Sequence, residues 1–110
     1  MIRCPFCDYG GPSEILARFG DSFVIEPMNP VTPGHVLVIP YVHVESTVER
    51  PLVLGSTMAD AARYAVEQGV GPCNIIVSHG LAATQTVFHL HVHIVPRRAG
   101  DGILLPWSER

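Results

Sequence analysis

The stretch VFHLHVHIVPR, residues 87–97, constrains the fold more than any other part of the chain. Histidines alternate strictly with apolar residues along it. Because successive residues of a strand point to opposite faces, the pattern predicts a strand with its histidines on one face, about 7 Å apart. The histidine face would hold His89, His91 and His93, and the apolar face Phe88, Leu90, Val92 and Ile94.

Such a row of imidazoles favours a chemical role. Imidazole can attack phosphorus, transfer a proton near neutral pH or bind a metal. A merely solvated strand face and a zinc site made of all three histidines are the alternatives. Ligands two positions apart on one strand normally supply two of the four zinc ligands, with the others coming from elsewhere in the chain.

The remaining pattern predicts an α+β fold, in which one main helix covers an antiparallel sheet. The 110 residues, 47% of them hydrophobic, suit a single domain over 1–110 with a packed core. Apolar runs at 14–20 and 22–27 flank Gly20-Asp21 and predict a hairpin, and further strands are expected at 35–40, 73–80 and 87–97. Residues 81–86 and the tail 98–110 are expected to be loops.

The helix is expected to begin at about Ser46 and to stop near Gly69. Pro51 would then lie in its first turn or divide a short helix from the main one. The apolar stripe expected to face the sheet contains Val53, Met58, Ala61, Ala62, Ala65 and Val66.

Charge and composition exclude several classes of partner. The net charge of −3 argues against a nucleic-acid-binding or basic membrane-binding surface. The sequence contains no apolar run of the roughly 20 residues that a membrane span needs. MIRCPFCDYG lacks the apolar stretch of a signal peptide, so a cytoplasmic location is expected. The chain has no lysine, which excludes lysine-based chemistry, and its three cysteines fit a disulfide framework poorly.

Cys4 and Cys7 form a C-x-x-C motif within an expected zinc-binding segment, residues 1–10. The short spacing suits two thiolates on one tetrahedral zinc ion. A redox pair and two unpaired cysteines are the alternatives. Cys73 opens an apolar strand and is expected to be a small buried side chain.

Three segments together resemble the histidine triad (HIT) family of nucleotide hydrolases and transferases. Gln85 to Arg97, QTVFHLHVHIVPR, is similar to the family's signature of alternating histidines. Asn29 to Ser46, NPVTPGHVLVIPYVHVES, resembles its loop, strand and following histidine, and CPFC resembles the start of many members.

The resemblance implies that His91 is a nucleophile that attacks the α-phosphate of a nucleoside phosphoramidate or dinucleoside polyphosphate. It implies that His93 shapes the phosphate site, that His35 completes the constellation, and that Gln85 with Thr86 contacts the leaving group or bridging atom. Preorganised donors around a phosphate supply much of the rate in such reactions. No role is implied for His79.

The same resemblance implies a Cys2His2 zinc site of Cys4, Cys7, His43 and His89, and thus a structural role for His89. It places the nucleoside pocket at Phe6, Ile25, Met28 and Leu37, and it implies a homodimer with a continuous sheet. The expected partner is a purine nucleotide or a nucleoside phosphoramidate. Trp107, in the tail, resembles a residue that reaches the partner's active site or covers an edge of its own chain.

Three positions depart from the family pattern. Thr84 stands where a glycine usually precedes the glutamine, and Ser78 stands where many members have asparagine. Pro27 stands where a ribose-binding Asp or Asn is usual, and Glu26 or Asn29 would have to substitute. Ser78 and Thr84 are retained as candidate phosphate-binding residues, although the departures leave the identity of the substrate open.

Three functions are therefore weighed. The first is a nucleotide hydrolase or nucleotidyltransferase that forms a nucleotidyl-histidine on His91, with phosphorolysis also possible. The second is a catalytically weak, zinc-stabilised nucleotide-binding module. The third is a zinc protein in which the whole row binds metal, with more than one zinc per chain.

Overall fold

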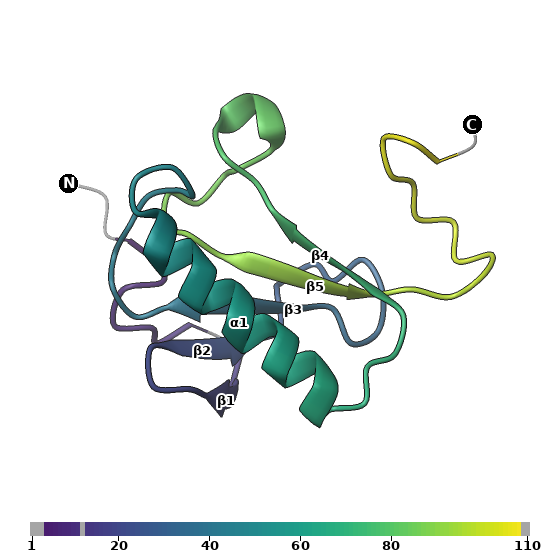
Figure 1. Ribbon diagram of the computed structural model, residues 1–110, viewed down its shortest axis with the longest axis horizontal. Helices are drawn as coiled ribbons and strands as arrows, with labels where there is room; N and C mark the ends of the chain where they lie inside the picture. Colours follow the sequence, from purple (N-terminus) through teal and green to yellow (C-terminus); the bar gives the residue numbers. More distant parts are fainter. Residues whose placement is uncertain (1–3, 12, 109–110) are drawn as a thin grey trace.

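The computed structural model describes residues 4–11 and 13–108. Residues 1–3 of the expected zinc-binding segment and residues 109–110 of the tail lie outside this range. Five strands form one antiparallel sheet in the order β1-β2-β3-β5-β4 (Figure 1). The strands are β1 (Ile15–Arg18), β2 (Ser22–Ile25), β3 (Val36–Pro40), β4 (Cys73–Val77) and β5 (Val92–Pro96). The expected α+β class, the hairpin at Gly20-Asp21 and the strand near 35–40 are confirmed.

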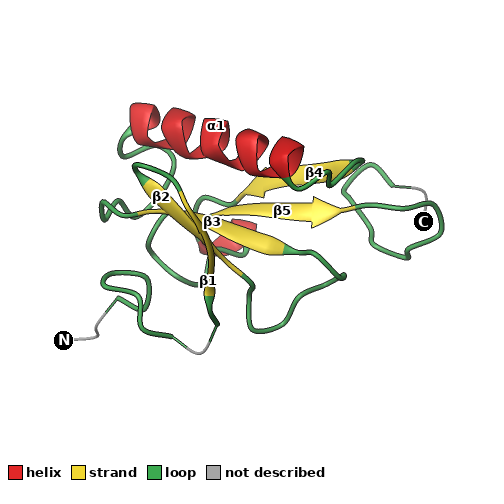
Figure 2. Ribbon diagram, turned by 90° about the horizontal axis from the view of Figure 1, so that it is seen from below, coloured by secondary structure: helices red, strands yellow, loops and turns green. Residues whose placement is uncertain are grey.

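One long helix, α1 (Pro51–Glu67), lies along one face of the sheet, and the segment before β1 lies on the other side (Figure 2). Strands β2 and β3 are buried along their whole length because both of their faces are covered. Two apolar clusters result. The cluster under α1 contains Val24, Val36, Val38, Ala61, Tyr64, Val92 and Ile94, and the cluster under the N-terminal segment contains Phe6, Phe23, Ile25, Leu37 and Ile39.

The helix begins at Pro51, and the expected start at Ser46 is wrong. Arg50, which precedes the proline, has φ −143° and ψ 89°, an extended conformation that a following proline favours. Proline suits the first helical position because the N–H that it lacks would have no partner there. Gly69, with φ +62°, follows the end of the helix as expected.

The stripe that α1 buries differs from the expected one at two positions. Ala62 and Val66 are exposed, whereas Thr57, Asp60 and Tyr64 are buried. The buried Asp60 accepts a hydrogen bond of 2.8 Å from the hydroxyl of Ser22 on β2. This bond makes a polar position compatible with the packed face.

The last strand is shorter than the expected 87–97, because only Val92–Pro96 pairs with its neighbours. Pairing with β3 stops at the pair Val38 and Val92, two residues before β3 ends at Pro40. Of the three alternating histidines, only His93 therefore lies within the sheet. The expected apolar face holds at Leu90, Val92 and Ile94, which are buried, but not at Phe88, which is 43% exposed.

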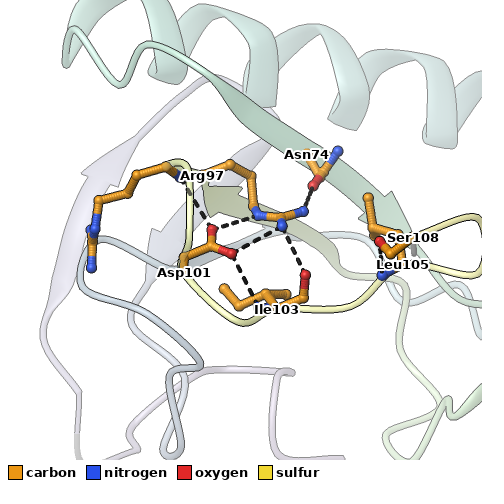
Figure 3. Close-up of polar contacts among 7 residues, drawn as sticks. Asn74, Arg97, Asp101, Ile103, Leu105 and Ser108 are labelled. Atoms are coloured by element: carbon orange, nitrogen blue, oxygen red, sulfur yellow. Dashed lines mark hydrogen bonds and ion pairs between the residues drawn. The ribbon is translucent and has the colours of Figure 1, made fainter. Parts of the chain in front are cut away.

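Residues 81–86 contain a short 3-10 helix, η1 (Leu81–Ala83), within the expected loop. The tail after β5 is irregular, as expected, and is fastened near the strand ends by Arg97 (Figure 3). The guanidinium of Arg97 donates hydrogen bonds to both carboxylate oxygens of Asp101, to Oδ1 of Asn74 on β4 and to the carbonyl of Ile103. Within the described residues, no helix is both long and apolar enough to cross a membrane.

Candidate active site and metal centre

A pocket of about 540 Å³ lies between the N-terminal segment and the face of the sheet opposite α1. The N-terminal segment, the end of β2, the loop after it and residues 86–87 supply its mostly apolar walls. Three imidazoles line it, two of them from the alternating row. Its lining includes Phe6, Val31, His35, Leu37, His91 and His93.

The imidazole of His91 is held in one tautomer. Its Nδ1 lies 2.9 Å from the carbonyl oxygen of His89. A carbonyl only accepts hydrogen bonds, so Nδ1 carries the proton and Nε2 keeps a free lone pair. Burial lowers the pKa of His91, which keeps the ring neutral near pH 7. The arrangement is that of an oriented nitrogen nucleophile.

His35 and His93 form a hydrogen-bonded pair in which the position of each proton is fixed. The backbone N–H of Val31 donates to Nδ1 of His35 at 3.1 Å, so the proton of this imidazole is on Nε2. That N–H faces Nδ1 of His93 at 3.0 Å, which leaves His93 with its own proton on Nε2. The rings of His91 and His93 are 5.2 Å apart between centroids. A hydrogen-bond donor therefore stands beside the candidate nucleophile.

The imidazoles of His35 and His93 are both neutral near pH 7. Burial, reinforced by the charges that His91 and His35 would carry, lowers the pKa of His93 to about 4. Burial also lowers the pKa of His35, and the nearby carboxylate of Glu26 opposes this shift. Neutral imidazoles can donate and accept in one direction along this pair, which two imidazolium ions could not.

The thiols of Cys4 and Cys7 converge with His43 and His89 on a second site. The four potential ligand atoms all lie within 4.8 Å of one another. Nδ1 of His89 is 3.4 Å from Sγ of Cys4 and 3.6 Å from Sγ of Cys7. Nδ1 of His43 is 3.3 Å from Sγ of Cys7 and 3.1 Å from Nδ1 of His89.

These distances fit a tetrahedral zinc ion. Bonds of about 2.3 Å to sulfur and about 2.0–2.1 Å to nitrogen place neighbouring ligand atoms about 3.3–3.8 Å apart. The Nε2 of His89 lies 2.8 Å from the carbonyl of Pro40, so Nε2 carries the proton and Nδ1 offers its lone pair to the site. Without a metal, burial and the adjacent Cys4 thiol raise the pKa of Cys7, because two thiolates there would repel each other. A divalent cation would reverse that preference.

The remaining predicted residues divide between the pocket and its surroundings. Thr86 lines the pocket, as do the four apolar residues Phe6, Ile25, Met28 and Leu37. Ser78, Thr84 and Gln85 lie outside this lining. Oε1 of Gln85 accepts from the N–H of Gly80, and its Nε2 donates to the carbonyls of Glu45 and Val87, so this buried amide joins three loop segments.

Several residues of the site carry no sequence signal that the alternating pattern could reveal. The carbonyl of Pro40 and the N–H of Val31 act through the backbone, which any residue type offers. Other parts of the pocket wall come from the N-terminal segment, where only proximity to the C-x-x-C motif could have suggested them. These wall residues are Pro5, Tyr9, Gly11 and Ser13.

Comparisons with known proteins give a consistent assignment. Residues 10–100 match the model of the HIT domain family. The chain is 33% identical over 106 residues to adenylylsulfatase HINT3 of Arabidopsis thaliana, covering 89% of this chain but only 54% of that protein. It is 30% identical to protein HitA of Neisseria gonorrhoeae, covering 86% of this chain and 96% of that one.

Solved structures show the same fold. A HIT family hydrolase from Clostridium thermocellum superposes with a TM-score of 0.77 at 30% identity, over 93% of this chain and 94% of that one. A zinc-bound histidine triad protein from Mycobacterium smegmatis superposes with a TM-score of 0.67 at 35% identity, over 84% of this chain and 70% of that one. The chain belongs to the HIT domain family.

Proposed function

We propose that this HIT protein is a nucleotide hydrolase or nucleotidyltransferase that acts through a nucleotidyl-histidine on His91. The substrate would be a nucleoside phosphoramidate or a dinucleoside polyphosphate with a purine base. The observation that carries the proposal is the anchored tautomer of His91, whose Nδ1 bond to the carbonyl of His89 leaves Nε2 free beside the pocket. A nucleotide-binding module has no need of a nucleophile held in this way.

In the first step, the Nε2 lone pair of His91 attacks the α-phosphorus, and the leaving phosphate or amine departs with the electrons of the broken bond, the amine taking up a proton from solvent. The ring becomes cationic, and its Nδ1–H continues to donate to the carbonyl of His89. His93, aligned by His35, would offer its Nε2–H to a phosphate oxygen. Water or another acceptor then attacks the phosphorus, loses a proton, and releases the nucleotide and neutral His91.

The base would lie against Phe6, Ile25, Met28 and Leu37, which line the pocket. We assign Thr86, which also lines it, to the phosphates. Ser78 and Thr84 remain assigned to phosphate binding only by resemblance, because neither lies on this wall. The same holds for Gln85, whose contact with a leaving group would require it to leave its present hydrogen bonds.

We further propose that Cys4, Cys7, His43 and His89 hold one structural zinc ion, which would fasten the N-terminal segment to the residues that precede β5. The similarity to a zinc-bound mycobacterial protein and the fit of the ligand distances support this. His91 and His93 do not belong to the cluster that the described residues form. A row in which all three histidines bind metal therefore has no support from the geometry.

The test is turnover of adenosine 5′-phosphoramidate and of a diadenosine polyphosphate by the zinc-loaded protein. Loss of the nucleophile should lower turnover by at least about a thousandfold in His91→Ala. His79→Ala, which changes a histidine outside the pocket, is the matched control and should keep its activity. Rapid acid quenching should also trap one nucleotide on the wild-type chain. Tight nucleotide binding without turnover would support the binding module instead, for which the internally engaged Gln85 is the structural argument.

A further inference from the structure

The segment that carries Cys4 and Cys7 also forms a wall of the nucleotide pocket. Phe6, between the two cysteines in sequence, lines that pocket and is only 9% exposed. Its ring meets the ring of His91 edge-on, with centroids 5.4 Å apart and an interplanar angle of 74°. It meets His89 in the same way, at 5.9 Å and 84°. One aromatic ring thus separates the metal centre from the candidate nucleophile.

Few contacts besides those of the two cysteines and Phe6 hold the N-terminal segment against the sheet. Across residues 4–11 and 13–108, no backbone hydrogen bond links residues 4–11 to the sheet. The contacts that hold the segment in place are those of the two thiols with His43 and His89 and the packing of Phe6 and Tyr9. Neutral thiols form only weak hydrogen bonds, whereas zinc coordination contributes strongly to the folding of the segments that it joins.

The other side of the metal centre does not depend on a metal in this way. His89 is completely buried, and its Nε2 donates to the carbonyl of Pro40 at the end of β3. The backbone of Leu90 is fixed by a bond of 2.7 Å to the carbonyl of Val44. His89 is therefore preorganised, and the backbone beside His43 is fixed through Val44. Metal binding would chiefly fix the position of the N-terminal segment and thus of Phe6.

We propose that metal loading at Cys4, Cys7, His43 and His89 controls the nucleotide affinity of the adjacent pocket through Phe6. Phe6 is then a positioning residue. It closes the apolar wall on the base and rests its edge on the ring of His91. This inference rests on the proposed function for the identity of the occupant, a purine nucleotide. It adds that the pocket reaches its full nucleotide affinity only while the C-x-x-C segment is held by the metal.

The experiment compares zinc-loaded, chelated and reloaded protein. Adenosine 5′-monophosphate binding is measured by calorimetry, and the ring-proton chemical shifts of His91 are measured by NMR without nucleotide. Losing one aromatic wall corresponds to about a tenfold weaker affinity, so chelation should weaken binding by about this factor and reloading should restore it. The His91 ring protons should also shift on chelation, because the neighbouring Phe6 ring moves away.

Two variants of Phe6 and one control variant separate the role of this residue from general loosening of the chain. Zinc-loaded Phe6→Ala should retain one zinc per chain by elemental analysis, yet bind the nucleotide about tenfold more weakly, with less than about a twofold further effect of chelation. Phe6→Leu keeps apolar bulk and should recover affinity to within about threefold of wild type. Phe88→Ala, which removes an exposed ring outside the pocket, should behave as wild type.

Three results would overturn the proposal: equal affinity of loaded and chelated wild type, wild-type affinity in loaded Phe6→Ala, or full zinc dependence remaining in that variant. Zinc-dependent binding without turnover would refute the catalytic function and leave the coupling intact. If the loaded protein bound no nucleotide, the nucleotide function would fail. The His91 shifts would then decide the coupling alone, and shifts unchanged by chelation would overturn it.

Discussion

Thr84 has a backbone conformation that its side chain opposes, so Thr84→Gly should stabilise the protein. Its φ is +72° and its ψ is 18°, the left-handed region, at the end of the 3-10 turn Leu81–Ala83. This conformation brings the N–H of Gln85 within 3.1 Å of the carbonyl of Gly80. The side chain of Gln85 can then join the neighbouring loops from its buried position. The backbone shape, more than any approach to phosphate, thus accounts for a preference for glycine here.

The expected magnitude follows from three opposing contributions. A left-handed conformation costs a residue with a Cβ roughly 1–2 kcal/mol, and a β-branched residue lies at the upper end. Glycine also has more conformational entropy in the unfolded chain, which lowers the free energy of unfolding by roughly 0.5–1 kcal/mol. The hydroxyl of Thr84 donates to the carbonyl of Ala83, but the residue is exposed and water replaces this bond at little cost. The net expectation is a gain of about 1 kcal/mol.

Urea unfolding followed by circular dichroism measures the change, which should appear as a rise of about 4 °C in Tm in a parallel thermal scan. Thr47→Gly is the matched control, because Thr47 has an ordinary negative φ and should lose about 0.5–1 kcal/mol. Thr84→Ala should gain less than Thr84→Gly, since it keeps the Cβ. A Thr84→Gly protein no more stable than wild type would refute the argument from backbone strain. The KM of this variant for adenosine 5′-phosphoramidate reports separately on any phosphate contact of the hydroxyl.

Three further predictions concern protonation, the tail and assembly. The pKa of His93, lowered by burial to about 4, lies below its unfolded value of about 6.5, so the unfolded chain binds more protons between these values. The stability from this group is therefore complete above about pH 6.5 and is lost as the pH falls toward 4, and urea melts of His93→Gln should show a flatter dependence across this range. Arg97→Leu should raise hydrogen exchange throughout residues 98–108, whereas Arg63→Leu, which breaks the pair with Asp60 and the contact with the Phe19 ring but nothing in the tail, should leave that exchange unchanged. β4 lies at the edge of the sheet with Ile76 36% exposed, so we expect a two-fold dimer that Ile76→Glu weakens; light scattering that gives the 12.0 kDa mass of one wild-type chain would contradict this.

The sheet was largely predictable because strands that are buried on both faces consist mainly of apolar residues. β3 is apolar at every position before Pro40, since α1 covers one of its faces and the N-terminal segment covers the other. The hairpin between β1 and β2 follows from Gly20-Asp21 between two apolar runs. The boundaries were less predictable where a proline decides them. Pro51 sets the start of α1, and β3 ends at Pro40.

The contacts of the N-terminal segment could not be predicted from the sequence, for a different reason. Its two cysteines predict a metal site, but their spacing does not predict that Phe6, which lies between them in sequence, contacts His91. That contact depends on the fold bringing His43 and His89 together beneath the segment, 36 and 82 positions beyond Cys7. Residue types predicted the metal site and the family resemblance placed Phe6 in the nucleoside pocket, but only the tertiary structure shows the contact of Phe6 with His91.

The histidines of the row differ in which ring nitrogen carries the proton, and no residue pattern specifies this. His89 and His91 are two positions apart and chemically identical, yet their tautomers are opposite. Nε2 of His89 donates to the carbonyl of Pro40 and leaves the Nδ1 lone pair facing the thiols of Cys4 and Cys7, whereas Nδ1 of His91 donates to the carbonyl of His89 and leaves the Nε2 lone pair free. The first carbonyl lies at the end of β3, and the second belongs to the segment that approaches β5 without strand pairing. Because the strand is shorter than expected, the two imidazoles bond to backbone carbonyls through different nitrogens, which is the arrangement that the proposed structural and catalytic roles require.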